Sequence, residues 1–89
     1  MEKILIVEDD EMICCGIVDT LQLRNWETET AASFSEAMKK IKTDEYMLYI
    51  LDMKFPDGNG IALCREIRKK TYRKTFIKKL KKNRNGELE

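Results

Sequence analysis

The stretch YMLYILDMKFPDGNG, residues 46–60, decides the fold because it joins an apolar strand to a turn through a carboxylate. Six mostly apolar residues, Tyr46 to Leu51, lead into Asp52, and a turn with one proline and two glycines follows. A carboxylate at the end of a buried strand is costly unless it is paired with another group or bound to a metal. The stretch therefore raises the question of which groups Asp52 faces.

Two further stretches have the pattern of strands. Lys3 to Val7 is a short β-branched run, typical of a strand that is covered on both faces of a parallel sheet. Glu27 to Ala31 alternates weakly between polar and apolar residues and predicts a short edge strand.

Three stretches have the spacing of helices. Apolar side chains recur at helical intervals over residues 12–24 and 34–41. The second of these helices starts with a capping box, in which Ser33 is followed three residues later by Glu36. A third helix starts near Ile61. The resulting order, β-α-β-α-β-α, predicts an α/β fold with a parallel sheet and helices on both of its faces.

The composition indicates one small domain with an uneven distribution of charge. The chain has 89 residues, 43% of them apolar, and a formal net charge of +1. Residues 1–64 carry six Lys or Arg and thirteen Asp or Glu, a net charge of −7, whereas residues 65–89 carry eleven and three, a net charge of +8. We therefore expect a β-α-β-α-β-α core over residues 1–70 and a basic tail, helical or frayed, over residues 71–89.

Cysteine use and hydropathy disfavour a secreted, zinc-binding or membrane protein. Three cysteines, two of them adjacent, do not form a disulfide framework, and the reduced thiols of a cytosolic protein are the better interpretation. The absence of histidine and of spaced cysteine pairs disfavours zinc. No apolar run is long enough for a membrane span, and a strand pattern starts where a signal peptide would stand. We therefore expect a cytoplasmic protein.

Acidic residues follow both of the strands that are expected to be most buried. Glu8 and Asp9 follow the first strand, and Asp52 follows the third. If these strands are neighbours in a parallel sheet, their ends lie about 5 Å apart, at the edge where such sheets bind ligands. Three converging carboxylates repel one another unless a cation is bound, and Mg²⁺ best suits such oxygen ligands.

Each acidic motif also has an ordinary structural interpretation. Acids after a strand commonly form the first turn of a helix, which we expect of Asp10 and Glu11. An Asp before a loop of Pro and Gly can simply start a turn. The occurrence of both motifs at matching strand ends favours a cation site.

Two segments together resemble the receiver domain of two-component response regulators: KILIVEDDE, residues 3–11, and YILDMKFPDGNG, residues 49–60. The resemblance extends over roughly Lys3 to Lys70. It implies a flavodoxin-like doubly wound parallel sheet with strand order 2-1-3. It also implies a two-component signal transduction module in a phosphorelay, rather than an enzyme.

The same resemblance implies roles for individual residues. Asp52 would be the phosphoacceptor for a histidine kinase. The cofactor would be Mg²⁺, with Glu8 acting through a water molecule. The implied metal ligands are Glu8, Asp9, Asp52 and the backbone carbonyl of Lys54.

The resemblance stops after the third helix, so we expect a receiver domain that is truncated there. In that family a fourth strand ends in a Ser or Thr that binds the phosphoryl group, and a fifth ends in a Lys, usually before Pro. Neither motif is recognisable in this sequence. We therefore expect impaired phosphate retention and an open edge on the third strand. Such an edge invites pairing with a second copy of the chain. One expected outcome is a homodimer, formed through the open edge or the basic tail, and the other is a poorly folded fragment.

The basic tail leaves several interpretations open. An apolar stripe of Tyr72, Phe76, Ile77 and Leu80 among lysines predicts an amphipathic helix. Alternatively, Phe76-Ile77 is a degraded fourth strand. The favoured interpretations are that this basic helix covers the exposed core or self-associates. Binding to nucleic acid is a less favoured interpretation. The competing hypothesis for the whole chain is a protein–protein assembly or nucleic-acid-binding module that uses the open sheet edge and the basic tail, with a vestigial acidic pocket.

Overall fold

Parallel strands form the centre of the computed structural model, which describes residues 3–52, 54–70 and 76–77. The strands of the sheet are β1 (Lys3–Val7), β2 (Glu27–Ala31), β3 (Leu48–Leu51) and β6 (Phe76–Ile77). Their order is β2-β1-β3-β6, and every neighbouring pair is parallel. The predicted order 2-1-3 of the first three strands is therefore confirmed, as is the flavodoxin-like α/β fold.

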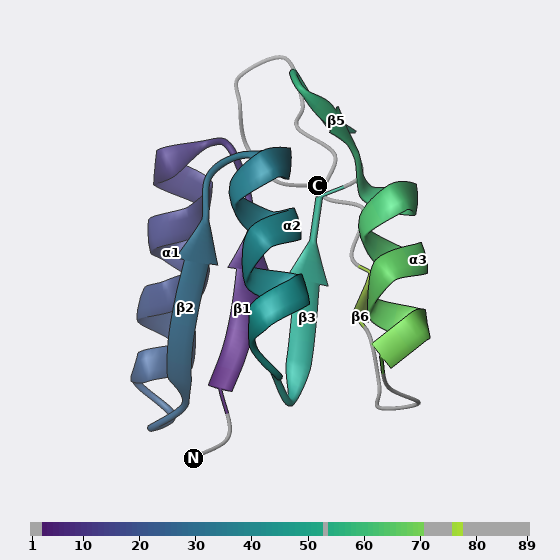
Figure 1. Cartoon of the computed structure of the whole chain (residues 1–89). Coiled ribbons are helices and arrows are strands. Elements are labelled where there is room, and N and C mark those ends of the chain that lie inside the picture. Colours follow the sequence, from purple (N-terminus) through teal and green to yellow (C-terminus); the bar gives the residue numbers. More distant parts are fainter. Residues whose placement is uncertain (1–2, 53, 71–75, 78–89) are drawn as a thin grey trace.

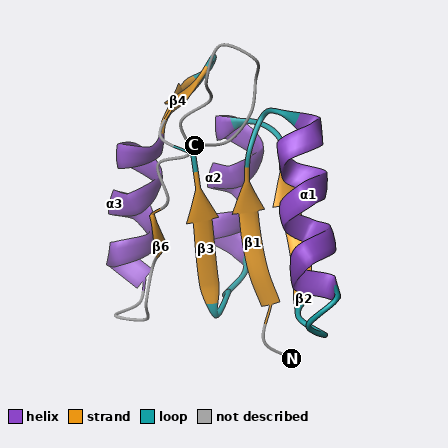
Figure 2. Ribbon diagram, turned by 180° about the vertical axis from the view of Figure 1, so that it is seen from behind, coloured by secondary structure: helices purple, strands orange, loops and turns teal. Residues whose placement is uncertain are grey.

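Helices cover both faces of this sheet (Figure 1, Figure 2). One face carries α1 (Glu11–Gln22), and the other carries α2 (Phe34–Thr43) and α3 (Gly60–Lys70), which lie side by side. A short antiparallel hairpin of β4 (Lys54–Phe55) and β5 (Gly58–Asn59) connects β3 to α3, where the sequence indicated only a loop. Within the described ranges no helix is long and apolar enough to cross a membrane.

The largest part of the core lies between the sheet and the pair α2 and α3. Residues 4–7 of β1 are all buried, because this strand has a neighbour on each side and helices on each face. In β3 only Tyr49 and Leu51 are buried. They belong to one apolar cluster with Ile41 of α2 and Leu63 of α3. This packing fixes the carboxyl ends of β1 and β3 beside each other.

Side-chain caps start the first two helices near the predicted positions. Asp10 is the N-cap of α1 and accepts a hydrogen bond from the backbone N–H of Ile13 (3.1 Å). Ser33 is the N-cap of α2 and accepts one from the N–H of Glu36 (3.2 Å). The Glu36 carboxylate accepts in turn from the N–H of Ala32 (3.0 Å), one residue before the cap. The predicted capping box is thus present, with its return bond shifted by one residue.

The expected open edge on β3 and the expected helical tail are wrong at the residues of β6. Phe76 lies opposite Ile50, and Ile77 lies opposite Leu51. Phe76–Ile77 therefore forms a fourth strand, as in the alternative interpretation of the sequence. Periodicity cannot separate a short apolar strand from a piece of helix, and pairing satisfies backbone groups that an open edge leaves unpaired. The other tail residues, 71–75 and 78–89, lie outside the described residues.

Candidate metal centre

Three carboxylates meet at the carboxyl edge of the sheet. Glu8 and Asp9 follow β1, and Asp52 follows β3. Val7 lies opposite Leu51 in the parallel register, so the residues after these two strands emerge side by side. One oxygen atom from each of the three carboxylates lies within 4.8 Å of the others. The structure thus brings together the three acidic side chains that the sequence singles out.

Backbone hydrogen bonds continue the sheet for one residue beyond the strands and hold the site in place. The N–H of Asp52 donates to the carbonyl of Val7 (3.1 Å), and the N–H of Glu8 donates to the carbonyl of Ala31 (3.1 Å). The Oε1 atom of Glu8 accepts a hydrogen bond from the N–H of Asp10 (3.1 Å). The orientation of the Glu8 side chain is therefore set by the first turn toward α1.

The three carboxylates differ in burial. Glu8 is 2% exposed, Asp52 is half-buried and Asp9 is exposed. Negative charges that are clustered and partly desolvated raise one another's free energy, so the arrangement favours a bound cation. A set of oxygen donors suits a hard divalent ion such as Mg²⁺. The residues that are present fit such an ion, with the exposed side of Asp9 leaving room for further ligands.

The other two acids of the first motif belong to α1. Asp10 caps this helix, and Glu11 lies in its first turn. The partial positive charge at a helix N-terminus stabilises carboxylates at both positions. The acidic run therefore divides between the carboxylate cluster and the start of a helix.

The β4–β5 hairpin begins two residues after Asp52, and its strand β5 contacts both α2 and α3. Lys54 starts β4, where its backbone pairs with Asn59. The role of the Lys54 carbonyl as a metal ligand stays a prediction. The side chain of Asp57 accepts hydrogen bonds from the N-terminus of α2, and that of Asn59 accepts one from the N–H of Ala62 in α3 (3.1 Å).

Sequence reasoning missed both of these loop contacts. An Asn just before an apolar helical pattern is a capping signal that could have identified Asn59. Nothing local marks Asp57, because its two partners lie 22 and 23 residues away in the chain.

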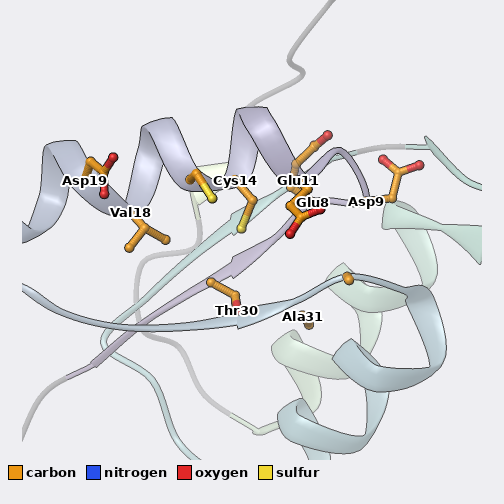
Figure 3. Close-up of a pocket in the computed structure, with 10 residues that line it drawn as sticks. Glu8, Asp9, Glu11, Cys14, Val18, Asp19, Thr30 and Ala31 are labelled. Carbon is orange, nitrogen blue, oxygen red and sulfur yellow. The ribbon is translucent and has the colours of Figure 1, made fainter.

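A groove of about 480 Å³ lies beside the carboxylates, between α1 and β2 (Figure 3). Its lining includes Glu8, Asp9, Glu11 and the thiols of Cys14 and Cys15. Burial, and after it the negative charges nearby, raise the pKa of Cys14. Because the thiolate is the reactive form of cysteine, these surroundings keep Cys14 protonated and unreactive near neutral pH.

Comparison with known families gives one match that spans most of the chain. A family model described as the response regulator receiver domain matches residues 4–82. The matched region includes the acidic residues at both strand ends and extends beyond Lys70.

Curated relatives include transcriptional regulatory proteins. The alkaline phosphatase synthesis transcriptional regulatory protein PhoP of Bacillus subtilis is 34% identical over 67 residues, which cover 75% of this chain and 28% of the relative. The DNA-binding transcriptional activator DevR/DosR of Mycobacterium tuberculosis is 37% identical over 70 residues, which cover 75% and 32%. The chain thus spans about a third of the length of the curated relatives it matches.

Solved structures agree with the fold. Response regulator TrrA from Thermotoga maritima, in complex with Mg²⁺ and BeF, is 36% identical, with a TM-score of 0.79 over 86% of this chain and 68% of that one. A chain in a complex of histidine kinase ThkA with TrrA is 32% identical, with a TM-score of 0.81 over 98% of this chain and 76% of that one. A CheY-like receiver domain from Methanospirillum hungatei is 26% identical, with a TM-score of 0.82 over 97% of this chain and 70% of that one.

Proposed function

The chain belongs to the response regulator receiver domain family, and we propose that Asp52 accepts a phosphoryl group from a histidine kinase in a Mg²⁺-dependent reaction. The observation that carries this proposal is the convergence of three carboxylates, with oxygens within 4.8 Å of one another, at the carboxyl edge of the sheet. We place the reaction in the cytoplasm. The protein acts as a signalling module rather than as an enzyme with turnover on a small substrate.

The proposed reaction is a transfer to a carboxylate oxygen. An oxygen of Asp52 attacks the phosphorus of a phosphohistidine in the kinase, and a P–O bond forms as the P–N bond breaks. The electron pair of the broken bond returns to the imidazole nitrogen, which takes up a proton. The backbone bond from Asp52 to Val7 (3.1 Å) holds the nucleophile at the end of β3 while it reacts.

The other acids would hold the cation. A Mg²⁺ ion reduces the repulsion between the anionic nucleophile and the anionic phosphoryl group, and stabilises the transferring oxygens. Asp9 and Asp52 would bind it directly, Glu8 through a water molecule, and the backbone carbonyl of Lys54 as a neutral ligand. The bond from the Asp10 N–H orients Glu8 toward this role.

We also propose that the phosphorylated state is short-lived. The receiver domains that the sequence resembles place a Ser or Thr after the fourth strand. After Ile77, the last residue of β6, the sequence reads KKLKKNRNGELE and contains neither hydroxyl residue. Without a hydroxyl at that position, the phosphoryl group would lose one of the contacts that retain it.

Intact-mass spectrometry tests the proposal. The protein is incubated with a small phosphodonor and Mg²⁺, beside an Asp52→Ala variant, a metal-free sample and an Asp19→Asn control, which removes a carboxylate of α1 outside the cluster. We expect one phosphoryl adduct in the wild type and in Asp19→Asn, and none in the other two. A folded wild type without an adduct, or an adduct that persists in Asp52→Ala, would overturn the assignment.

Self-association and nucleic-acid binding remain secondary predictions. Pairing of β6 with β3 at Ile50 and Leu51 reduces the free edge on which a sheet-completing homodimer was expected. Sedimentation velocity at increasing protein concentration measures self-association. Binding to DNA that weakens steeply with added salt would support nucleic-acid binding as a function of this chain.

A further inference from the structure

The β4–β5 hairpin is too short to hold its own position. Its two strands contain two residues each, joined by Pro56 and Asp57. A two-stranded hairpin of this size is not stable alone in water. Its location beside Asp52 must therefore depend on contacts with the rest of the molecule.

A carboxylate in the hairpin turn binds the N-terminus of α2. The Oδ1 atom of Asp57 accepts a hydrogen bond from the N–H of Phe34 (3.0 Å), and Oδ2 accepts one from the N–H of Ser35 (3.2 Å). These bonds lower the pKa of Asp57, the one from Phe34 most strongly. Both donors belong to the first turn of α2, where the helix macrodipole adds to the attraction.

The helix does not need Asp57 in order to start. Its own N-cap, Ser33, already accepts from the N–H of Glu36 (3.2 Å), and the N–H of Ala37 donates to the carbonyl of Ser33 (3.0 Å). The bonds to Asp57 instead link two segments that are distant in the sequence. Their structural effect is to fix the hairpin on the helix.

Apolar contacts hold the same hairpin against the same helix. The backbone of Gly58 lies so close to the ring of Phe34 that a Cβ atom at position 58 would overlap it. Phe55 of β4 is 8% exposed and belongs to the core cluster, against which Phe34 packs. On the other side, Asn59 accepts a hydrogen bond from the N–H of Ala62 in α3 (3.1 Å).

We propose that Asp57 is a positioning residue for the metal centre: by binding the N-terminus of α2 it fixes the hairpin, and with it the backbone of Lys54, beside Asp52. This inference rests on the proposed function, because it concerns the hairpin's share of the Mg²⁺ site. Asp57 itself binds neither the metal nor the phosphoryl group. It couples the start of α2 to the geometry of the acidic site.

The test compares two caps on one helix. Asp57→Ala removes the hairpin's bonds to α2, whereas Ser33→Ala removes the helix's own cap and leaves the hairpin unchanged. Both variants should lower stability against urea. Only Asp57→Ala should weaken Mg²⁺ binding, measured by calorimetry on the unphosphorylated protein, by about ten-fold, as for other residues that support metal ligands. Asp57→Asn, which keeps one acceptor oxygen, should recover part of the affinity.

A second variant and a direct readout complete the experiment. Gly58→Ala pushes the hairpin away from Phe34 and should weaken Mg²⁺ binding in the same direction as Asp57→Ala. Amide hydrogen exchange at Phe34 and Ser35 should speed up in Asp57→Ala, which reports the loss of the contact itself. Equal Mg²⁺ affinities of Asp57→Ala and Ser33→Ala would overturn this inference alone. A folded wild type that binds no Mg²⁺ would overturn the proposed function and this inference with it.

Discussion

Adjacent acids in the first motif have different partners because the chain turns between them. Glu8 is buried and accepts from the N–H of Asp10, whereas Asp10 accepts from the N–H of Ile13. Glu8 and Asp9 therefore meet Asp52, while Asp10 serves α1. The free-energy cost of the carboxylate cluster is mutual repulsion, whereas a change at Asp10 removes a helix cap.

Asp52→Asn should stabilise the protein in metal-free buffer. The change removes one charge from a cluster whose oxygens lie within 4.8 Å, and it relieves about 1–3 kcal/mol of repulsion at the effective dielectric of a protein surface. In saturating Mg²⁺ the wild type gains stability from the bound ion, so the advantage of the variant should shrink or reverse. Urea unfolding in EDTA and in Mg²⁺ measures both differences. A variant that is less stable than the wild type in EDTA would contradict the electrostatic account of the site.

Asp10→Ala should destabilise the protein by about 1 kcal/mol, the usual cost of a lost N-cap. The N–H of Ile13 loses its acceptor, while the backbone N–H that Asp10 donates to Glu8 is retained. Asp10→Asn, which caps almost equally well, is the matched control. Thermal unfolding in EDTA checks the difference, and equal losses in the two variants would argue against capping as the cause.

Elements at the opposite edge of the sheet are joined by a charged cluster. Glu29 of β2 pairs with Lys3 of β1, and the hydroxyl of Tyr46, just before β3, donates to Glu29 (3.1 Å). Lys40 of α2 adds a longer contact (3.8 Å). Tyr46 is buried, and burial together with the bond to Glu29 raises its pKa. Two strands, one helix and the connection before β3 thus meet at one carboxylate.

Glu29→Gln should destabilise the protein at neutral pH and have no effect at low pH. The bond from Lys3, and then that from Tyr46, lower the pKa of Glu29 below the usual range of a glutamate. A carboxyl group with a lowered pKa contributes stability above its unfolded pKa, and loses that contribution as the pH falls through its folded pKa. The difference between variant and wild type should therefore start to shrink as the pH falls below the unfolded pKa of a glutamate, about 4.3, and should disappear only once the pH is below the lowered pKa of Glu29 in the folded protein.

The same substitution at an exposed site of β2 is the control for this prediction. Glu27→Gln changes an exposed carboxylate on the same strand. Urea unfolding at neutral and at acid pH should give a pH-dependent loss for Glu29→Gln that is much larger than for Glu27→Gln. Similar losses of stability for the two variants at both pH values would mean that the contacts of Glu29 with Lys3 and Tyr46 add nothing to the effect of its charge.

The molecule as a whole is a parallel sheet in which each edge needs a neighbour or a cover. β1 is central, β2 lies on one side, and β6 extends the other side of β3. Within the part of the chain that the structure describes, the pairing with β6 is short and joins Ile50 and Leu51 to Phe76 and Ile77. The contribution of this strand to stability and to self-association can be measured by shortening the chain.

A chain that ends at Lys70 should self-associate more strongly than one that ends at Ile77. The shorter chain exposes the edge of β3 at Ile50 and Leu51, and unpaired parallel edges recruit other chains. Its unfolding midpoint should also fall by roughly 5 °C, the effect of about 1 kcal/mol in a domain of this size. Sedimentation velocity and thermal unfolding of both chains test this. Identical behaviour would mean that β6 does not protect the edge.

Much of this protein was determined by local sequence alone. The β-branched run of β1, the helical spacing of α1 and α2, and the caps Asp10 and Ser33 act over a few residues, so their patterns are readable in order along the chain. The alternation of strand and helix then restricts the topology to a parallel sheet, and the parallel sheet places the acids after β1 and β3 at one edge. The candidate site could be predicted because it depends on this topology rather than on detailed packing.

Tertiary structure decided the features whose partners lie far apart in the chain. Phe76–Ile77 became a strand because β3 offered it backbone partners, although its own pattern also suited a helix. Asp57 accepts bonds from Phe34 and Ser35 because the fold brings the hairpin to the N-terminus of α2, although these residues lie 23 and 22 positions away in the sequence. Hydrogen bonds and edge pairing of this kind depend on distances in space, and those distances exist only once the sheet and its helices have packed.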